Sequence, residues 1–160
     1  MNDTRTVIDS KLWSRVTASG DCWIWAAETK NSDSTYGKFS LNGRMVLAHR
    51  VAYECAVGPI PAGFVIDHIC HMLRCVNPEH LQAVTVQANG ENRSGPTAIS
   101  TSGVRGVSWN KRLQQWQAYA ARNGKRSHGG YYDSIPEAEA AAIALRMRIQ
   151  TNNILDRVAA

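Results

Sequence analysis

The sequence lacks any run of about 18 apolar residues, so a membrane-spanning helix is not expected. Residues 1–10 also lack the apolar stretch of a secretory signal, and we therefore expect a cytoplasmic protein. Internal repeats and low-complexity tracts are absent as well. Apolar residues still make up 44% of the 160 positions, which is enough for one domain of ordinary size or two small ones, each with a buried core.

Cysteine is scarce, with four residues in all, and acidic residues are scarce in the last part of the chain. In a cytoplasmic protein, so few cysteines are more often metal ligands or free thiols than disulfides. Residues 1–92 carry 8 Lys+Arg and 9 Asp+Glu, a net charge of −1, whereas residues 93–160 carry 10 and 4, a net charge of +6. This asymmetry indicates a polyanionic partner, with nucleic acid strongly favoured over an anionic membrane.

One shift in composition divides the chain. Residues 94–102 contain Gly, Pro and several Ser and Thr without apolar periodicity, which is typical of a linker. We therefore expect a first domain over residues 1–93, a second over 103–150 and a C-terminal tail over 151–160.

The first domain shows mixed helical and strand patterns. A polar loop is expected over residues 27–35, and Asn42-Gly43 predicts a tight hairpin turn because both positions accept a positive φ. Gly58 is expected to stop a helix. The helices are expected at 9–16, 49–57 and 86–92, and the strands at 22–26, 36–41, 44–48 and 64–67.

The second domain has a simpler pattern. Asn123-Gly124 predicts another hairpin turn, and Ser134 with Glu137 forms a capping box at the start of an alanine-rich helix over 135–149. Strands are expected at 104–109, 115–121 and 125–132. The fold class is therefore α+β, with a three-stranded antiparallel sheet packed on one helix in this domain.

Three soft or borderline metal ligands lie close together in the first domain. They have the spacing C-x4-C-x4-H and are Cys70, Cys75 and His80. A structural zinc ion takes four such ligands, so one has to come from elsewhere in the chain. Cys22 is the best candidate because its strand precedes the hairpin that could lie against this loop. Cys55, on an apolar helix, and His71 are the alternatives.

Oxygen ligands and a histidine flank this zinc loop. Asp67 directly precedes His68, and Asn89 follows the loop. Carboxylate and amide oxygens suit a hard cation such as Mg²⁺, and a histidine can accept a proton from water. The set can therefore cleave a phosphodiester with a single metal ion. Asn92 is the alternative to Asn89 as ligand, whereas Asn77, before Pro78, is expected to cap the turn that carries His80.

The segment DHICHMLRCVNPEHL resembles the core of the HNH nucleases, and its zinc loop is similar to that of the His-Cys box homing endonucleases. The motifs CWIW, YGKF and AHR upstream also look like this family, so the resemblance covers residues 12–93. The matching positions are Asp67, His68, Cys70, Cys75, Asn77, Pro78, His80, Leu81 and Asn89.

This resemblance implies a zinc-stapled ββα-metal fold. His68 would be the general base, Asp67 and Asn89 would hold one Mg²⁺ or Mn²⁺, and the products would carry 5′-phosphate and 3′-hydroxyl ends. Arg50 is our candidate for a second positive contact to the scissile phosphate. No cysteine follows Cys75, so the second zinc site of the His-Cys box enzymes is not expected.

The second domain is similar to the plant ethylene-response-factor type of DNA-binding domain over residues 103–146, through RGVSW, NGK and GYYD. That family lays its sheet in the major groove and packs a helix behind it. The resemblance implies DNA contacts from basic and aromatic residues on the sheet and its turns: Arg105, Lys111, Arg112, Tyr119, Arg122, Lys125 and Arg126.

The sequence therefore predicts a metal-dependent endonuclease of the homing or phage type that cuts double-stranded DNA inside a host cell. A monomer would nick one strand, and a homodimer would cut both. The alternative is a non-catalytic, zinc-stabilised DNA-binding regulator, which has no need for Asp67, His68 and Asn89 together. RNA is less favoured as a substrate because its A-form major groove is too narrow to admit a sheet.

Overall fold

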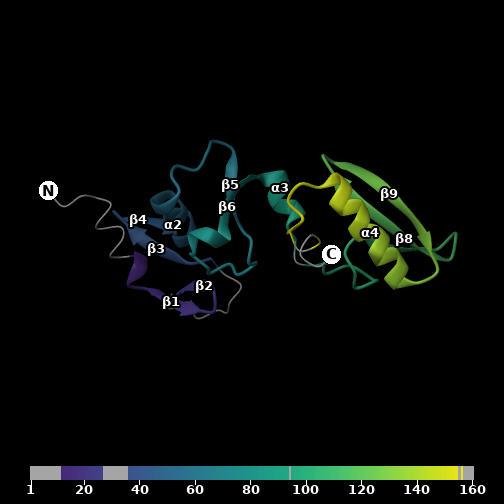
Figure 1. The fold of residues 1–160 in the computed structure, drawn as a ribbon, viewed down its shortest axis with the longest axis horizontal. Coiled ribbons are helices and arrows are strands. Elements are labelled where there is room, and N and C mark those ends of the chain that lie inside the picture. Colours follow the sequence, from purple (N-terminus) through teal and green to yellow (C-terminus); the bar gives the residue numbers. More distant parts are fainter. Residues whose placement is uncertain (1–11, 27–35, 94, 155, 157–160) are drawn as a thin grey trace. The chain divides into compact units, whose positions relative to one another are not determined.

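The computed structural model describes residues 12–26, 36–93, 95–154 and 156. The chain divides into two compact units, Met1–Thr85 and Val86–Ala160 (Figure 1). Both contain helices and antiparallel strands, which confirms the expected α+β class. Among the described residues, no helix is long and apolar enough to cross a membrane. Residues 155 and 157–160 of the tail expected over 151–160, and the whole loop expected over 27–35, lie outside the described residues.

In its described part, the first unit contains three separate two-stranded antiparallel sheets. They are β1 (Val16–Ser19) with β2 (Cys22–Trp25), β3 (Lys38–Leu41) with β4 (Arg44–Leu47), and β5 (Phe64–His68) with β6 (Leu81–Thr85). Strands β1 and β6 were not expected from the sequence. The helix expected over 9–16 lies partly outside the described residues, and its last residue, Val16, instead begins β1 and pairs with Trp25.

The hairpin turn and the helix of this unit form as predicted. Asn42 and Gly43 both have positive φ angles, 50° and 77°, so the β3–β4 turn uses the conformation that favours these two residue types. Helix α2 (Ala48–Ala56) follows β4 directly, and its C-cap, Val57, precedes Gly58. Its buried face joins one core, made of Leu12, Trp25, Phe39, Ala48, Val51, Ala52, Ile66, Val76 and Leu81.

The loop between β5 and β6 contains one turn of 3-10 helix, η1 (Pro78–His80). Asn77 caps this turn as predicted, because its side-chain oxygen accepts a hydrogen bond from the Glu79 amide at 3.1 Å. The cap fixes the start of the turn, and His80, at the other end, leads into β6.

The second unit contains one three-stranded antiparallel sheet in the order β7-β8-β9, and α4 packs on one face of it. The elements are α3 (Val86–Glu91), β7 (Val107–Asn110), β8 (Gln115–Arg122), β9 (Lys125–Tyr132) and α4 (Ile135–Ile149). Ser134 and Glu137 form the predicted capping box of α4. Small side chains at the helix–sheet contact let the two layers approach closely, namely Ala118, Ala138 and Ala142 beside Val107.

Strand β7 begins at Val107, not at residue 104 as the sequence suggested, because a turn occupies the residues before it. Gly106 has a φ of 79°, and its carbonyl accepts a hydrogen bond from the Tyr119 amide at 2.8 Å. A Cβ atom at Gly106 would lie 2.5 Å from the Tyr119 carbonyl oxygen. The position therefore requires glycine both for its backbone angle and for its space.

Replacing Gly106 with alanine tests this close approach. Gly124→Ala is the matched control, since Gly124 has a φ of 70° and no atom within 4 Å of a Cβ there. Both changes introduce backbone strain, but only Gly106→Ala also places a methyl group against the Tyr119 carbonyl. This clash should lower the free energy of unfolding by about 1–3 kcal/mol more than Gly124→Ala does. Amide hydrogen exchange in β8 of the full chain measures the opening free energy. Equal losses in the two variants would contradict the assigned contact.

Candidate functional site

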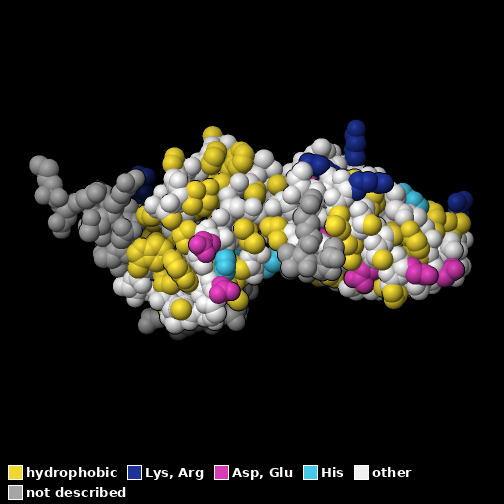
Figure 2. All heavy atoms as spheres, viewed as in Figure 1, with side chains coloured by type: hydrophobic (Ala, Val, Ile, Leu, Met, Phe, Trp, Pro, Cys, Tyr) yellow, Lys and Arg dark blue, Asp and Glu magenta, His cyan; other side chains and the backbone are white. Residues whose placement is uncertain are grey.

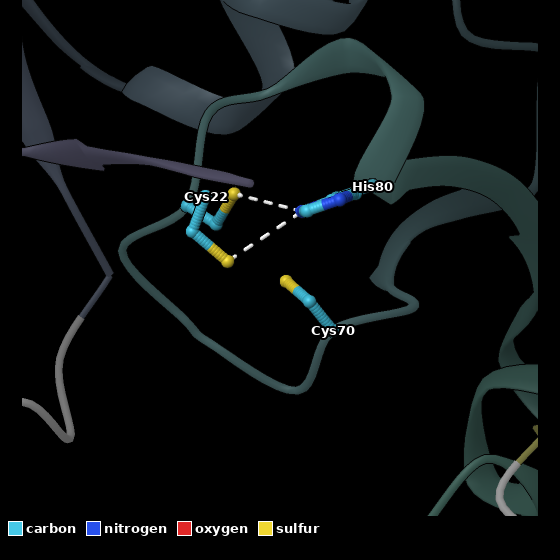
Figure 3. Close-up of side chains that lie close together, drawn as sticks. Cys22, Cys70 and His80 are labelled. Carbon is cyan, nitrogen blue, oxygen red and sulfur yellow. Dashed lines mark hydrogen bonds between the residues drawn. The ribbon is translucent and has the colours of Figure 1, made fainter. Parts of the chain in front are cut away.

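Four candidate metal ligands converge from β2, from the loop after β5 and from η1 (Figure 3). They are Cys22, Cys70, Cys75 and His80, and their ligand atoms lie within 4.8 Å of one another. Nδ1 of His80 is 3.5 Å from Sγ of Cys22 and 3.6 Å from Sγ of Cys75. Neighbouring ligands of a tetrahedral zinc ion are about 3.5–3.8 Å apart, so this Cys3His cluster can hold zinc.

The two alternative ligands lie outside this group. Cys55 packs against the core of the first unit from α2, and His71 follows Cys70 with a positive φ of 57°. The structure thus brings together the three ligands with the C-x4-C-x4-H spacing and the Cys22 thiol that we favoured as the fourth.

Two thiols of the Cys3His cluster, those of Cys22 and Cys70, resist ionisation when no metal ion is bound. Burial, and then the neighbouring Cys75 and Cys70, raise the pKa of Cys22 to about 12. Burial also raises the pKa of Cys70. A divalent cation reverses this effect, because it stabilises thiolates that otherwise repel one another. The arrangement therefore suits a metal ion better than a set of free thiols.

Backbone pairing across a long stretch of sequence brings the two halves of the cluster together. Ile24 in β2 forms an isolated antiparallel bridge with Cys75. The Trp25 amide donates to the Arg74 carbonyl at 2.9 Å, and the Val76 amide donates to the Trp23 carbonyl at 2.8 Å. The loop after β5 thus lies along β2, which carries the Cys22 thiol to the other three ligands.

His68, the predicted general base, is the last residue of β5 and only 4% exposed. Its Nε2 lies 3.1 Å from the Cys75 carbonyl oxygen. A carbonyl only accepts, so Nε2 carries the proton and the neutral ring has its lone pair on Nδ1. Burial lowers the pKa of His68 despite the opposing effects of the Cys75 carbonyl and Asp67, which keeps the ring in the neutral form that a base requires.

Asp67, the predicted metal ligand, precedes His68 on β5 and is also buried. Its Oδ2 accepts a hydrogen bond from Nε2 of Gln82 on β6 at 3.0 Å. Asp67 and Gln82 are direct partners in the β5–β6 register. This contact orients the carboxylate from a neighbouring strand, as expected for an oxygen ligand held by its surroundings.

Two aromatic neighbours of His68 were missed in the sequence. The ring of His49, at the start of α2, lies 4.8 Å from the His68 ring in an edge-on arrangement, and the Tyr36 ring lies 5.0 Å from His49 and 5.9 Å from His68. Burial, His68 and Arg50 lower the pKa of His49 to about 3, so it stays uncharged. Arg50, the predicted phosphate contact, is half-buried next to it. The only sequence signal for His49 was its place in AHR.

The predicted amide ligand lies in the second unit, on α3. Asn89 is partly exposed, whereas Asn92 is 6% exposed and follows the end of the helix. Asp67, the other predicted oxygen ligand, is as buried as Asn92, at 6% exposed. Asn89 therefore stays the predicted ligand, with Asn92 as the alternative.

Apart from Arg122 at the end of β8, five of the predicted DNA contacts belong to the sheet of the second unit or to its turns. The four cations among them are exposed: Lys111, Arg112, Lys125 and Arg126. The Arg126 guanidinium lies 3.4 Å above the ring of the fifth, Tyr119. Tyr119 pairs with His128, between the buried Ala118 and Ala120, and therefore points to the face away from α4. Figure 2 shows the basic side chains of this unit standing apart from its acidic ones.

The other two predicted contacts, Arg105 and Arg122, have partners inside the second unit. Arg105 donates to the carbonyls of Arg93 at 3.0 Å and Glu91 at 2.8 Å. Arg122 donates to the Ile149 carbonyl and lies 3.6 Å from the Glu91 carboxylate. Both remain predicted DNA contacts, but fewer of their donors are available than for the four exposed cations.

Comparisons with known proteins agree with the motifs of the first unit. Residues 46–91 match a family model described as HNH endonuclease. This stretch includes Arg50, Asp67, His68 and three members of the Cys3His cluster. No solved structure matches the chain.

The similar proteins come from bacteriophages. Protein 7.7 of Escherichia phage T7 is 34% identical over 110 residues, which cover 68% of this chain and 78% of that protein. Protein 3.8 of the same phage is 33% identical over 78 residues, covering 49% of this chain and 64% of that protein. Protein 2.8 is 38% identical over 77 residues, covering 47% and 50%. The chain therefore belongs to the family of Protein 7.7 of Escherichia phage T7, and its residues 46–91 are similar to HNH endonucleases.

Proposed function

We propose that this protein is a metal-dependent endonuclease that hydrolyses phosphodiester bonds of double-stranded DNA. The observation that carries the proposal is the state of His68. It is buried beside Asp67 in the HNH segment, and the Cys75 carbonyl holds its proton on Nε2. A neutral imidazole with a fixed proton is ready to accept another from an attacking water molecule.

The residues around His68 support this role. His49 and Tyr36 pack against its ring, so its orientation is restricted. Asp67 and Asn89 have the oxygen donors that would hold Mg²⁺ or Mn²⁺. When bound, this ion supplies positive charge against the phosphate and the leaving 3′ oxygen. Arg50 would add a second cationic contact to the phosphate.

The Cys3His cluster would hold a structural zinc ion. Its four protein ligands complete a tetrahedral shell and leave no open position for a substrate, as in other structural zinc sites. The contribution of zinc is to keep Cys75, and with it the carbonyl that bonds to His68, in place against β2.

The sheet face away from α4 would bind the DNA duplex, in line with the likeness of this unit to ethylene-response-factor domains. The exposed cations Lys111, Arg112, Lys125 and Arg126 stand at its turns and edge, and the ring of Tyr119 lies on the same face. Because the similar proteins are phage proteins, we place this activity on DNA inside the host cell, with the protein acting as a monomer or a homodimer.

The zinc assignment predicts a matched set of effects. Cys22→Ser, Cys70→Ser, Cys75→Ser and His80→Ala should each lower zinc content and the thermal midpoint, because metal binding contributes directly to folding. A loss of about 2 kcal/mol would lower the midpoint by roughly 8–16 °C in a unit of this size. Cys55→Ser is the control and should keep its zinc. Metal analysis that finds zinc lost only in the Cys55 variant would refute the cluster.

Replacing the general base should abolish cleavage and spare binding. His68→Ala should lower the rate of nicking of supercoiled plasmid by about 10²–10⁴-fold in the presence of Mg²⁺. Zinc content and affinity for the same DNA should stay close to those of the unchanged protein, since His68 acts on water. Wild-type cleavage by this variant would remove His68 from the mechanism. DNA binding without cleavage by the unchanged protein would instead favour the regulator.

The sheet face predicts a salt-dependent difference between two arginines. Arg126→Ala should lower affinity for all DNA sequences and reduce the slope of log affinity against log salt by about 0.9, as expected for one lost phosphate contact. Arg148→Ala, which removes an exposed charge from α4 on the other layer, should leave the slope unchanged. Binding of a DNA duplex at several salt concentrations gives the slope for each variant. If the Arg126 and Arg148 variants have equal slopes, Arg126 makes no phosphate contact.

A further inference from the structure

Helix α3 carries the proposed amide ligand but is too short to be stable alone. It spans the six residues Val86–Glu91, whereas isolated helices need about 12–15 residues to be even marginally stable in water. Asn89 lies within this helix. Whatever holds α3 in place therefore also sets the position of Asn89.

The carboxylate of Glu91 ties the end of α3 to the segment that follows α4. Glu91 is only 3% exposed, and its Oε2 accepts hydrogen bonds from the Thr151 amide at 2.7 Å and the Asn152 amide at 3.2 Å. Its Oε1 accepts from Gln87 at 3.2 Å and lies 3.6 Å from Nε of Arg122. Burial opposes ionisation, but these hydrogen bonds outweigh it and lower the pKa of Glu91.

The backbone carbonyls of α3 are held by the same unit. Nδ2 of Asn152 donates to the Ala88 carbonyl at 3.0 Å, and the Arg105 guanidinium donates to the Glu91 carbonyl at 2.8 Å. The last carbonyls of a helix have no partner inside it, and a cation at that end also interacts favourably with the helix dipole. Thus both the carboxylate and the carbonyls at the end of α3 are satisfied by residues far along the chain.

We infer that Glu91 is a positioning residue through which the segment after α4 holds α3, and with it the amide ligand of the catalytic metal. This inference rests on the proposed function, which assigns that ligand to Asn89. The second unit then has two tasks. Its sheet face would bind DNA, and the contacts of Glu91 with Thr151 and Asn152 hold the helix that carries Asn89.

The experiment measures metal binding in the full chain without using cleavage. The free Mn²⁺ signal in electron paramagnetic resonance gives the affinity for Mn²⁺, and amide hydrogen exchange in metal-free protein reports on α3. Glu91→Ala should weaken Mn²⁺ binding by about 10-fold or more, as expected when a group that orients a ligand is lost. Exchange in α3 should become faster. Glu91→Gln, which keeps an acceptor for the Thr151 amide, should recover most of the affinity.

Asp156→Asn is the matched control for a purely structural loss. The Asp156 carboxylate pairs with Arg146 at 2.6 Å and contacts no part of α3 among the hydrogen bonds and ion pairs of the described residues. This variant should lower the thermal midpoint but leave Mn²⁺ affinity unchanged. If it weakens Mn²⁺ binding as much as Glu91→Ala does, general destabilisation explains the effect and the inference is wrong.

Asn89→Ala separates this inference from the function on which it rests. If Asn89→Ala weakens Mn²⁺ binding and Glu91→Ala does not, the ligand stands and the positioning role falls. If Asn89→Ala itself has no effect, the proposed metal site is wrong. Should Glu91→Ala fail to fold, Asn152→Ala takes its place, because it removes the side-chain bond to the Ala88 carbonyl and keeps the backbone amide that donates to Glu91. Unchanged affinity in that variant would also overturn the inference.

Discussion

The hydrogen bond between the His68 imidazole and the Cys75 carbonyl joins the two chemical parts of the first unit. Cys75 contributes its thiol to the Cys3His cluster and its carbonyl to the proposed base, so one residue serves both. The bridge between Cys75 and Ile24 fixes this residue against β2. A metal ion in the cluster would thereby stabilise the protonation state of His68 without touching it. In many metal sites, hydrogen bonds from neighbouring groups orient the metal ligands. Here the relation is reversed, because the metal site would orient a neighbouring group, His68, through the Cys75 carbonyl.

The parts of the fold that the sequence predicted depend on local chemistry. Asn42-Gly43 requires a positive φ, and the Ser134–Glu137 box caps its own helix, so neither needs knowledge of distant contacts. The spacing of the cluster was also local for three of its four ligands. Strand β6 and the packing of His49 against His68 were missed because they depend on pairing between segments that only the folded chain brings together. For the same reason the sequence could not reveal the internal partners of Arg105 and Arg122.

The charge of the second unit is used in two ways. Two of its carboxylates, Glu91 and Asp156, are buried and bonded to arginines or backbone amides, which neutralises part of the positive charge internally. The remaining cations at the sheet turns are exposed to solvent. The net charge of the sequence therefore counts two kinds of arginine together: those bonded inside the protein and those exposed to a polyanionic partner. The field felt by DNA would come from the second group, because exposed charges are the ones that steer an encounter.

The pairing of β2 with the loop after β5 also sets an order of events during folding. The Arg74 side chain donates to the Trp25 carbonyl, and the Trp25 amide donates to the Arg74 carbonyl. These two residues are 49 positions apart in the sequence. Closing a loop of this size costs entropy before any contact repays it, and contacts between distant residues slow folding. The β3–β4 hairpin can form early, whereas Cys75 reaches β2 only once the chain through Val76 is available. A partly synthesised chain would therefore lack both the Cys3His cluster and the hydrogen bond that orients the His68 imidazole, and the two would form together in a single late step.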